Sequence, residues 1–219
     1  MSTSDNPAQP IVLLGAGGHA GVVLEALRLS GFLVVGVCDP IFDSGETMSA
    51  GDLPVIKGDT LCESYPPAKY VLANGIGMMP GQHKRKVLFE DMDALGYRFA
   101  TVIHPSAIVS DATDIGTGVQ IMAGAIIQND VSIGAQSIIN TGVRVDHGCR
   151  IGSLAHVSPG VVLTGDVTVG DEAFIGAGAT IINGIKVGSK AVIGAGAVII
   201  EDVPDGATIV TPAIRGIVQ

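Results

Sequence analysis

The most constraining feature of the chain is an aliphatic residue repeated at every sixth position of its second half. From Ile103 to Ile199, each sixth residue is isoleucine, valine or leucine. A period of six excludes an amphipathic helix, whose period is about 3.6 residues. No hairpin turn signal interrupts the run, which argues against an antiparallel barrel. Glycine follows one of these aliphatic residues on a second period of eighteen, at Gly116, Gly134, Gly152, Gly170 and Gly188.

Six residues per side and eighteen per turn describe a triangular coil of short parallel strands. Each aliphatic side chain then points to the axis, and each coil is stabilised by contacts with the coils above and below it. The composition suits such a narrow interior, because the chain has 31 glycines, no tryptophan and only 4% aromatic residues. We therefore expect residues 101–219 to form a parallel β-helix.

The first hundred residues have a different pattern, in which apolar strands alternate with helices. We expect strands at residues 11–14, 32–38, 69–73 and 98–102, and helices ending near residue 28 and spanning 80–95. Residues 41–51 are small and polar, which predicts a loop. Strands that alternate with helices indicate a small parallel sheet of the α/β class in residues 1–100.

A glycine-rich loop at residues 15–21 connects the first expected strand to the first expected helix. Glycine at these positions lets backbone N–H groups approach a diphosphate at the helix N-terminus. Asp39 ends the next strand and could accept hydrogen bonds from a base or a ribose. The alternatives are a purely structural turn and an NAD site, because Gly15, Gly17 and Ala20 loosely match the dinucleotide fingerprint. A β-helix would be an unusual substrate domain for hydride transfer.

Charge and composition exclude some classes of partner. The formal net charge is −9 and the densest basic cluster is residues 84–86, whereas nucleic-acid binding needs a concentrated basic face. The longest apolar run, residues 191–200, is too short to span a bilayer, and the first ten residues lack the pattern of a signal peptide. The three cysteines are scattered and odd in number, which favours reduced thiols and a cytoplasmic location.

The two halves together resemble the bacterial nucleotide-sugar acetyltransferases of the sialic-acid and bacillosamine type. The resemblance runs from the loop at 15–21 through 103–105 to 202–208, and its most informative stretches are residues 140–147 and 151–158. It implies a small Rossmann-like domain in residues 1–100 and a left-handed parallel β-helix in residues 101–219. It also implies an acetyl-CoA-dependent N-acetyltransferase for a nucleotide-linked amino-deoxy sugar, with no metal, in surface glycan (lipopolysaccharide, O-antigen) biosynthesis.

The resemblance assigns roles to particular residues. His147 would be the general base, and His156 would contact acetyl-CoA. Members of this family are expected to be homotrimers, with coenzyme A in the groove between neighbouring β-helices. The nucleotide sugar would be held by Gly17, Gly18, His19, Asp39, Pro40 and Gly75.

The chain departs from this family at the residue after the proposed base. Several members have an acidic residue there, which raises the basicity of the histidine, but this chain has Gly148. Asp146 precedes His147, and alternation along a strand should direct its side chain to the opposite face. The basicity of His147 must therefore be supported by another carboxylate, or not at all.

Acetyl transfer to an amine needs a group that takes up the amine proton and donors for the carbonyl oxygen. A histidine with a pKa near 6.5 can accept that proton close to neutral pH, which contributes roughly 10²–10⁴-fold. Gly165 lies eighteen residues after His147, so its backbone N–H could serve the acetyl carbonyl from the next coil. Asn140 could add a side-chain hydrogen bond.

Several alternatives remain at this point. His147 and His156 could be structural residues of the β-helix, and His19 could only cap the first helix. A zinc site of the β-helical carbonic anhydrase kind needs three histidines, whereas the coils proper, beyond the domain junction at His104, offer only His147 and His156, nine residues apart. A non-catalytic sugar-binding scaffold and an O-acetyltransferase for a sialic-acid-type sugar are the other readings. The nucleotide could be UDP, GDP or CMP.

Overall fold

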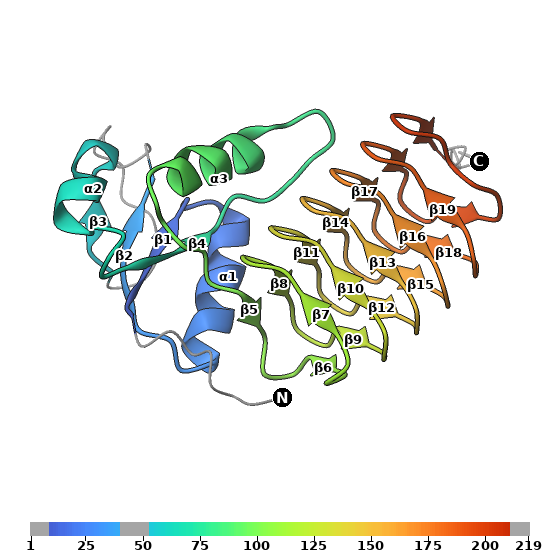
Figure 1. The fold of residues 1–219 in the computed structure, drawn as a ribbon, viewed down its shortest axis with the longest axis horizontal. Coiled ribbons are helices and arrows are strands. Elements are labelled where there is room, and N and C mark those ends of the chain that lie inside the picture. Colours follow the sequence, from blue (N-terminus) through green and yellow to red (C-terminus); the bar gives the residue numbers. More distant parts are fainter. Residues whose placement is uncertain (1–8, 40–52, 211–219) are drawn as a thin grey trace, which may run out of the picture.

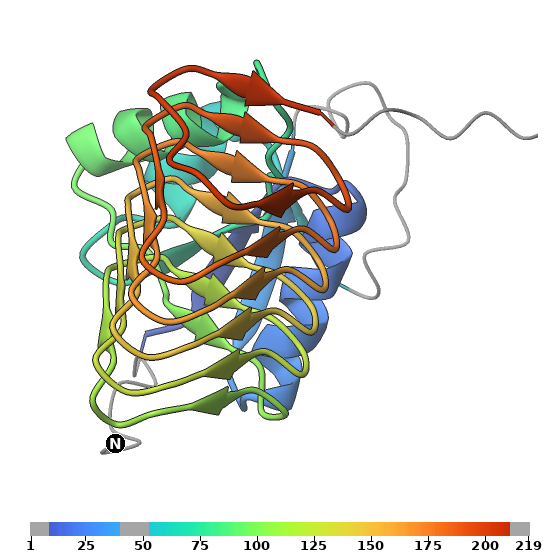
Figure 2. The same ribbon diagram turned by 90° about the vertical axis from the view of Figure 1, so that its right-hand side faces the viewer.

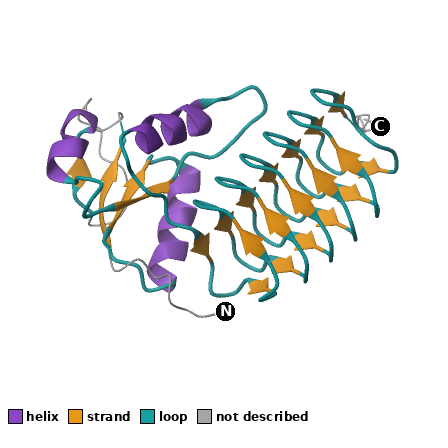
Figure 3. Ribbon diagram, in the orientation of Figure 1, coloured by secondary structure: helices purple, strands orange, loops and turns teal. Residues whose placement is uncertain are grey.

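The computed structural model describes residues 9–39 and 53–210, which form an α/β domain followed by a stack of β-coils (Figure 1). The N-terminal sheet is parallel, with the strand order β3-β2-β1-β4. Three helices accompany it, and Figure 3 shows that they belong only to this half of the described chain. The elements are β1 (Ile11–Leu14), α1 (Gly18–Leu29), β2 (Val34–Cys38), β3 (Val55–Ile56), a 3₁₀ turn (Gly58–Thr60), α2 (Leu61–Ser64), β4 (Val71–Asn74) and α3 (Lys84–Ala94).

The structure corrects several boundaries of this first domain. The helix expected over 80–95 begins only at Lys84, and the short elements β3 and α2 were not expected. In place of the strand expected at 98–102, Phe99 makes a single parallel bridge to Leu72, and Val102 already belongs to the β-helix. The loop expected at 41–51 lies outside the described residues.

Residues 102–210 form the left-handed parallel β-helix, whose coils are stacked in Figure 2. Each coil contributes one two-residue strand to each of three parallel sheets. Sheet I consists of β5 (Val102–Ile103), β8 (Gln120–Ile121), β11 (Ile138–Ile139), β14 (His156–Val157), β17 (Phe174–Ile175), β20 (Val192–Ile193) and β22 (Thr208–Ile209).

Sheets II and III complete the triangle. Sheet II consists of β6 (Ile108–Val109), β9 (Ile126–Ile127), β12 (Arg144–Val145), β15 (Val162–Leu163), β18 (Thr180–Ile181) and β21 (Val198–Ile199). Sheet III consists of β7 (Asp114–Ile115), β10 (Ser132–Ile133), β13 (Arg150–Ile151), β16 (Thr168–Val169) and β19 (Lys186–Val187).

The six-residue repeat is explained by the interior of the coils. Strands pair with residues eighteen positions apart in register, as Ile133 does with Ile151. The repeated aliphatic residues therefore stack in columns along the axis, and those from Ile121 to Ile199 are buried in one continuous core. The prediction of a parallel β-helix from the repeat is confirmed.

The glycines with the eighteen-residue period are required by the close approach of successive coils. A Cβ atom on Gly170 would lie 2.4 Å from the backbone nitrogen of Ser189, and one on Gly134 would lie 2.4 Å from that of Ser153. Atoms of the rigid backbone cannot move away from such a contact without disturbing the next coil. The column at 116, 134, 152, 170 and 188 is therefore a steric requirement of the stack.

We expect Gly170→Ala to destabilise the protein by about 1–3 kcal/mol, the usual cost of overpacking a rigid interior. Thermal unfolding followed by circular dichroism measures the effect as a lowered Tm. The control is Gly21→Ala in α1, where an added Cβ meets nothing within 4 Å. That variant should be neutral or slightly stabilising, because alanine is the better helix former. An unchanged Tm for Gly170→Ala would contradict the steric explanation.

The N-terminal domain packs on the outer face of sheet I. Met122 and Val102 of the coils share a buried cluster with Ala20, Val23 and other residues of α1 and the sheet. A salt bridge of 3.0 Å between Lys86 of α3 and Glu172 adds a polar contact. Sheet I is thus the covered face of the β-helix. Among the described residues, no helix has both the length and the apolar character needed to cross a membrane.

Candidate functional site

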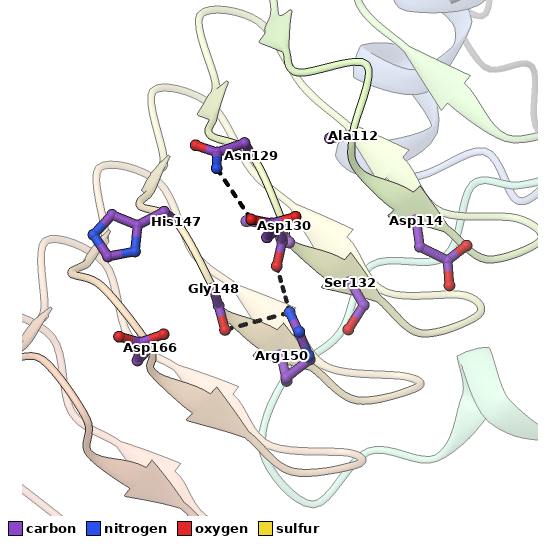
Figure 4. A pocket seen from close by; sticks show the side chains of 10 residues that line it. Ala112, Asp114, Asn129, Asp130, Ser132, His147, Gly148, Arg150 and Asp166 are labelled. Carbon is purple, nitrogen blue, oxygen red and sulfur yellow. Dashed lines mark hydrogen bonds between the residues drawn. The ribbon is translucent and has the colours of Figure 1, made fainter.

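A groove of about 820 Å³ runs along the outside of the coils at the corner between sheets II and III (Figure 4). His147 is exposed at this corner, in the tight turn that directly follows β12. The same corner is occupied by Asn129 one coil earlier and by Gly165 one coil later. The lining residues are Ala112, Asp114, Asn129, Asp130, Val131, Ser132, His147, Gly148, Arg150 and Asp166.

The ring of His147 lies against the backbone of Gly165. A Cβ atom on Gly165 would be only 2.7 Å from Cε1 of the ring and 2.9 Å from Nε2. Glycine at 165 therefore leaves room for the imidazole beside the next coil. The structure brings these two predicted residues together, as their eighteen-residue spacing indicates.

Two other polar residues near His147 in sequence do not pair with its ring. Asp146 Oδ1 accepts a hydrogen bond of 2.8 Å from the backbone N–H of His147 itself. Asn140 lies at the corner between sheets I and II, where its Oδ1 accepts a hydrogen bond of 2.8 Å from the backbone N–H of Thr141. Within one chain, Asn140 and His147 therefore lie at different corners of the triangle, one before β12 and one after it.

Two residues from outside the glycine-rich loop, Asp39 and Gly75, lie close to it. Asp39 Oδ2 accepts a hydrogen bond of 2.7 Å from the backbone N–H of Ala16. A Cβ on Gly75 would lie 2.7 Å from the carbonyl oxygen of Leu14, so only glycine fits there. In contrast, a Cβ on Gly17 or Gly18 would meet nothing within 4 Å. The N-terminus of α1 is therefore open to a ligand, and Pro40 lies outside the described residues.

A chain of hydrogen bonds connects this loop to the β-helix. His19, the second residue of α1, lies 2.8 Å through Nε2 from Oε1 of Gln120, and Gln120 Nε2 donates to the carbonyl oxygen of Asn74 at 2.6 Å. Because the Gln120 amide nitrogen is used by that carbonyl, its oxygen must accept from His19. The proton of neutral His19 is thereby placed on Nε2. Burial lowers the pKa of His19 despite this hydrogen bond, and the charge of Arg85 lowers it further.

His156 is buried beneath the N-terminal domain, with 7% of its surface exposed. Its ring stacks on Phe174 of the next coil at a centroid distance of 5.0 Å, and its Nδ1 has no hydrogen-bond partner among the described residues. Burial lowers the pKa of His156 to about 4, with smaller contributions from His19 and Arg85. The ring is therefore neutral at physiological pH.

The depressed pKa of His156 makes the stability of the protein dependent on pH. Its folded pKa lies below its unfolded value of 6.5, so the unfolded chain binds more protons as the pH falls from about 7 towards 4. The free energy of unfolding therefore decreases as the pH falls through that window. Between pH 7 and pH 5, we expect this decrease to be about 2 kcal/mol smaller in His156→Gln than in the unmodified chain. Urea unfolding at the two pH values measures the difference. His83→Gln, at an exposed position, is the control and should leave the pH dependence unchanged.

Arg85 links α3, β4 and the coils from a fully buried position. Its Nε donates to the carbonyl oxygen of Gln136 at 3.0 Å, and its Nη1 donates to those of Asn74 and Ile76 at 3.0 and 2.7 Å. Burial lowers the pKa of Arg85 to about 9, so the guanidinium remains charged at neutral pH. Neither Arg85 nor Gln120 was identified from the sequence.

The described residues thus place most of the predicted site residues in two groups, and Asn140 lies apart from both at the corner between sheets I and II. Gly17, Gly18, His19, Asp39 and Gly75 surround the first helix, with His156 beneath them on sheet I. His147 and Gly165 lie on a different edge of the triangle, between sheets II and III. Within residues 9–39 and 53–210, no group of three or more histidine, cysteine, aspartate or glutamate side chains could hold a metal ion.

Comparison with known proteins identifies both halves of the chain. Residues 10–91 match the PglD N-terminal domain family, and residues 166–201 match the hexapeptide repeat of succinyl-transferase. No curated protein sequence matches the chain.

The chain is also similar to solved structures along almost its full length. PerB from Caulobacter crescentus, in complex with CoA and GDP-perosamine, is 35% identical with a TM-score of 0.83, over 93% of this chain and 95% of that one. The acetyltransferase domain of PglB from Neisseria gonorrhoeae, in complex with acetyl coenzyme A, is 33% identical with a TM-score of 0.83, over 93% and 96% of the two chains. WeeI from Acinetobacter baumannii is 25% identical with a TM-score of 0.82, over 93% and 97%. The chain therefore belongs to the left-handed β-helix sugar N-acetyltransferases that carry a PglD-type N-terminal domain, and it is an acetyltransferase.

Proposed function

We propose that the chain transfers the acetyl group of acetyl-CoA to the amine of an amino-deoxy sugar carried on UDP or GDP. The observation that carries this proposal is the pairing of an open helix N-terminus behind a glycine-rich loop with a histidine-lined groove on the β-helix. The similarity to PerB, in complex with CoA and GDP-perosamine, supports the same pair of ligands. Among the described residues, Cys38, Cys62 and Cys149 form no disulfide, which supports a cytoplasmic reaction.

We assign the nucleotide sugar to residues 1–100 and acetyl transfer to residues 101–219. Backbone N–H groups at Gly17 and Gly18 would receive the diphosphate, because a helix N-terminus favours negative charge. His19, Asp39, Pro40 and Gly75 would border the same ligand. On the β-helix, His156 and the Gly165 N–H would contact acetyl-CoA, and Asn140 would add a side-chain hydrogen bond in the catalytic site.

His147 would act as the general base. Its ring is exposed and can approach an amine, and a histidine is the side chain whose charge changes most readily near neutral pH. As the amine nitrogen bonds to the acetyl carbon, the bond from that carbon to sulfur breaks and the amine proton passes to His147. The same proton can then neutralise the leaving thiolate, which regenerates the free base.

The separation of the two groups of residues supports a homotrimer in which each site is shared by two copies. His147 and the glycine-rich loop occupy different parts of one chain, so both can reach one sugar only when they come from neighbouring copies. The outer face of sheet II offers a contact surface, since it carries Ile108 and Val198, each 64% exposed, with Ile126 and Val162 between them. A molar mass of three chains in sedimentation equilibrium is expected.

The function is tested by incubating the purified protein with acetyl-CoA and a panel of UDP- and GDP-linked 4-amino-4,6-dideoxy sugars. Release of free thiol is followed, and it should require one particular sugar. Silence with every amino sugar but release with CMP-sialic acid would replace the amine acceptor by a hydroxyl. Silence with every acceptor, together with no binding of acetyl-CoA, would contradict the enzymatic proposal and leave a sugar-binding scaffold.

A further inference from the structure

The space beside Gly148 is filled by the carboxylate of another residue. A Cβ atom built on Gly148 would lie 2.2 Å from Oδ1 of Asp166. That separation is far shorter than any real contact of a Cβ atom, so the Asp166 carboxylate occupies the volume in which a side chain at 148 would begin. The carboxylate of Asp166 therefore occupies the space that a side chain at position 148 would otherwise fill.

The geometry of the coils explains this substitution. Asp166 follows Gly148 by eighteen residues, so it occupies the same corner one coil further on. Both residues have left-handed backbones, with φ of 71° at Gly148 and 60° at Asp166, and the Asp166 N–H donates to the carbonyl oxygen of His147 at 2.9 Å. The His147 ring lies against Gly165, the residue before Asp166. The ring thus leans toward the coil that carries this carboxylate.

We propose that Asp166 is the positioning carboxylate of His147 and takes the place of an acidic residue directly after it. The carboxylate would hold the imidazole in its working orientation and stabilise the positive charge that the ring acquires with the amine proton. This inference rests on the proposed role of His147 as the base.

Three other charged groups around His147 are engaged elsewhere. Asp146 binds the backbone N–H of His147, and Asp130 accepts a hydrogen bond of 3.2 Å from the side chain of Asn129. The guanidinium of Arg150 donates to backbone carbonyl oxygens, among them that of Gly148 at 3.3 Å. The carboxylate of Asp166 makes no hydrogen bond to another described residue, so it is available to the imidazole. Asp114 completes the charged lining of the groove.

The first test removes the charge without changing the shape. In Asp166→Asn, kcat should fall about tenfold with KM little changed, because the ring loses the group that orients it and that stabilises the positive charge it acquires. In the free protein, the NMR chemical shifts of the two His147 ring nitrogens should also change, because they respond to the groups that surround the imidazole.

The second test moves the carboxylate back to the residue after His147. The double variant Gly148→Asp with Asp166→Gly starts an acidic side chain in the volume that the Asp166 carboxylate occupies, and it should recover most of kcat/KM. Aspartate is tolerated by this corner, because Asp130 and Asp166 adopt the same left-handed conformation, with φ of 57° and 60°. Gly148→Asp alone should be destabilised, since the two carboxylates would then compete for one space.

The matched control is Asp130→Asn, at the same corner one coil earlier. It removes an equal charge from the groove and should change kcat and the ring-nitrogen shifts of His147 by less than half as much. Unchanged ring-nitrogen shifts in Asp166→Asn, or an equal change in Asp130→Asn, would overturn the proposal. The NMR readout needs no substrate. Changed ring-nitrogen shifts in a chain that acetylates no sugar would therefore support the pairing while contradicting the proposed function.

Discussion

His147→Ala is expected to lower kcat/KM by about 10²–10⁴-fold, the range that general-base catalysis contributes. The loss should fall mainly on kcat, because the variant removes a proton acceptor and leaves the nucleotide loop intact. The groove is open at this corner and the ring is exposed, so the fold should tolerate the change. Stopped assays of thiol release with a saturating sugar acceptor measure the effect.

A second variant tests the same ring without removing it. Gly165→Ala would place a Cβ 2.7 Å from Cε1 of His147 and force the ring off the next coil. We expect it to reduce kcat as well, although the base itself is retained. His83→Ala is the control, since His83 is exposed at the start of α3 and should leave kcat/KM unchanged. Full activity in His147→Ala would remove His147 from the base role.

The β-helix could be predicted from the sequence because its geometry repeats. Every coil places one aliphatic residue per side on the axis, which gives the sequence a period of six. Every coil approaches the next closely at Gly116 and its equivalents, which gives a second period of eighteen. The same regularity related Gly165 to His147 across two coils. The same eighteen-residue offset relates Asp166 to Gly148, so this pair is also visible in the sequence.

The contacts between the two domains could not be predicted in this way. His19 and Gln120 are 101 residues apart, and no period connects them. Their contact depends on how α1 docks on sheet I, which is decided by the shape of the buried cluster around Met122. Arg85 illustrates the same difficulty, because the sequence shows it as the centre of a basic triplet. Only the tertiary structure distinguishes it from its exposed neighbour Lys84.

The buried position of Arg85 leads to the largest expected effect on stability. Arg85→Met removes the donor from three carbonyl oxygens, those of Asn74, Ile76 and Gln136. An acceptor left buried without a partner costs about 1–3 kcal/mol. Removal of the buried charge returns part of this loss, because a charge without a carboxylate partner is itself costly inside a protein. We expect a net destabilisation of about 3 kcal/mol, measured by urea unfolding at pH 7.

Lys84→Met provides the matched control for this loss. It removes an equal positive charge from the adjacent residue of the same helical turn, but Lys84 is exposed. Surface changes of this kind usually stay within about 0.5 kcal/mol. Arg85→Lys keeps the charge but not the planar fork that serves three carbonyls, so it should fall between the two. Equal stability of Arg85→Met and Lys84→Met would show that Arg85 adds nothing to the apolar and other polar contacts between the domains. A deficit confined to Arg85 would instead identify this guanidinium as a polar link that stabilises the position of the nucleotide loop relative to the β-helix.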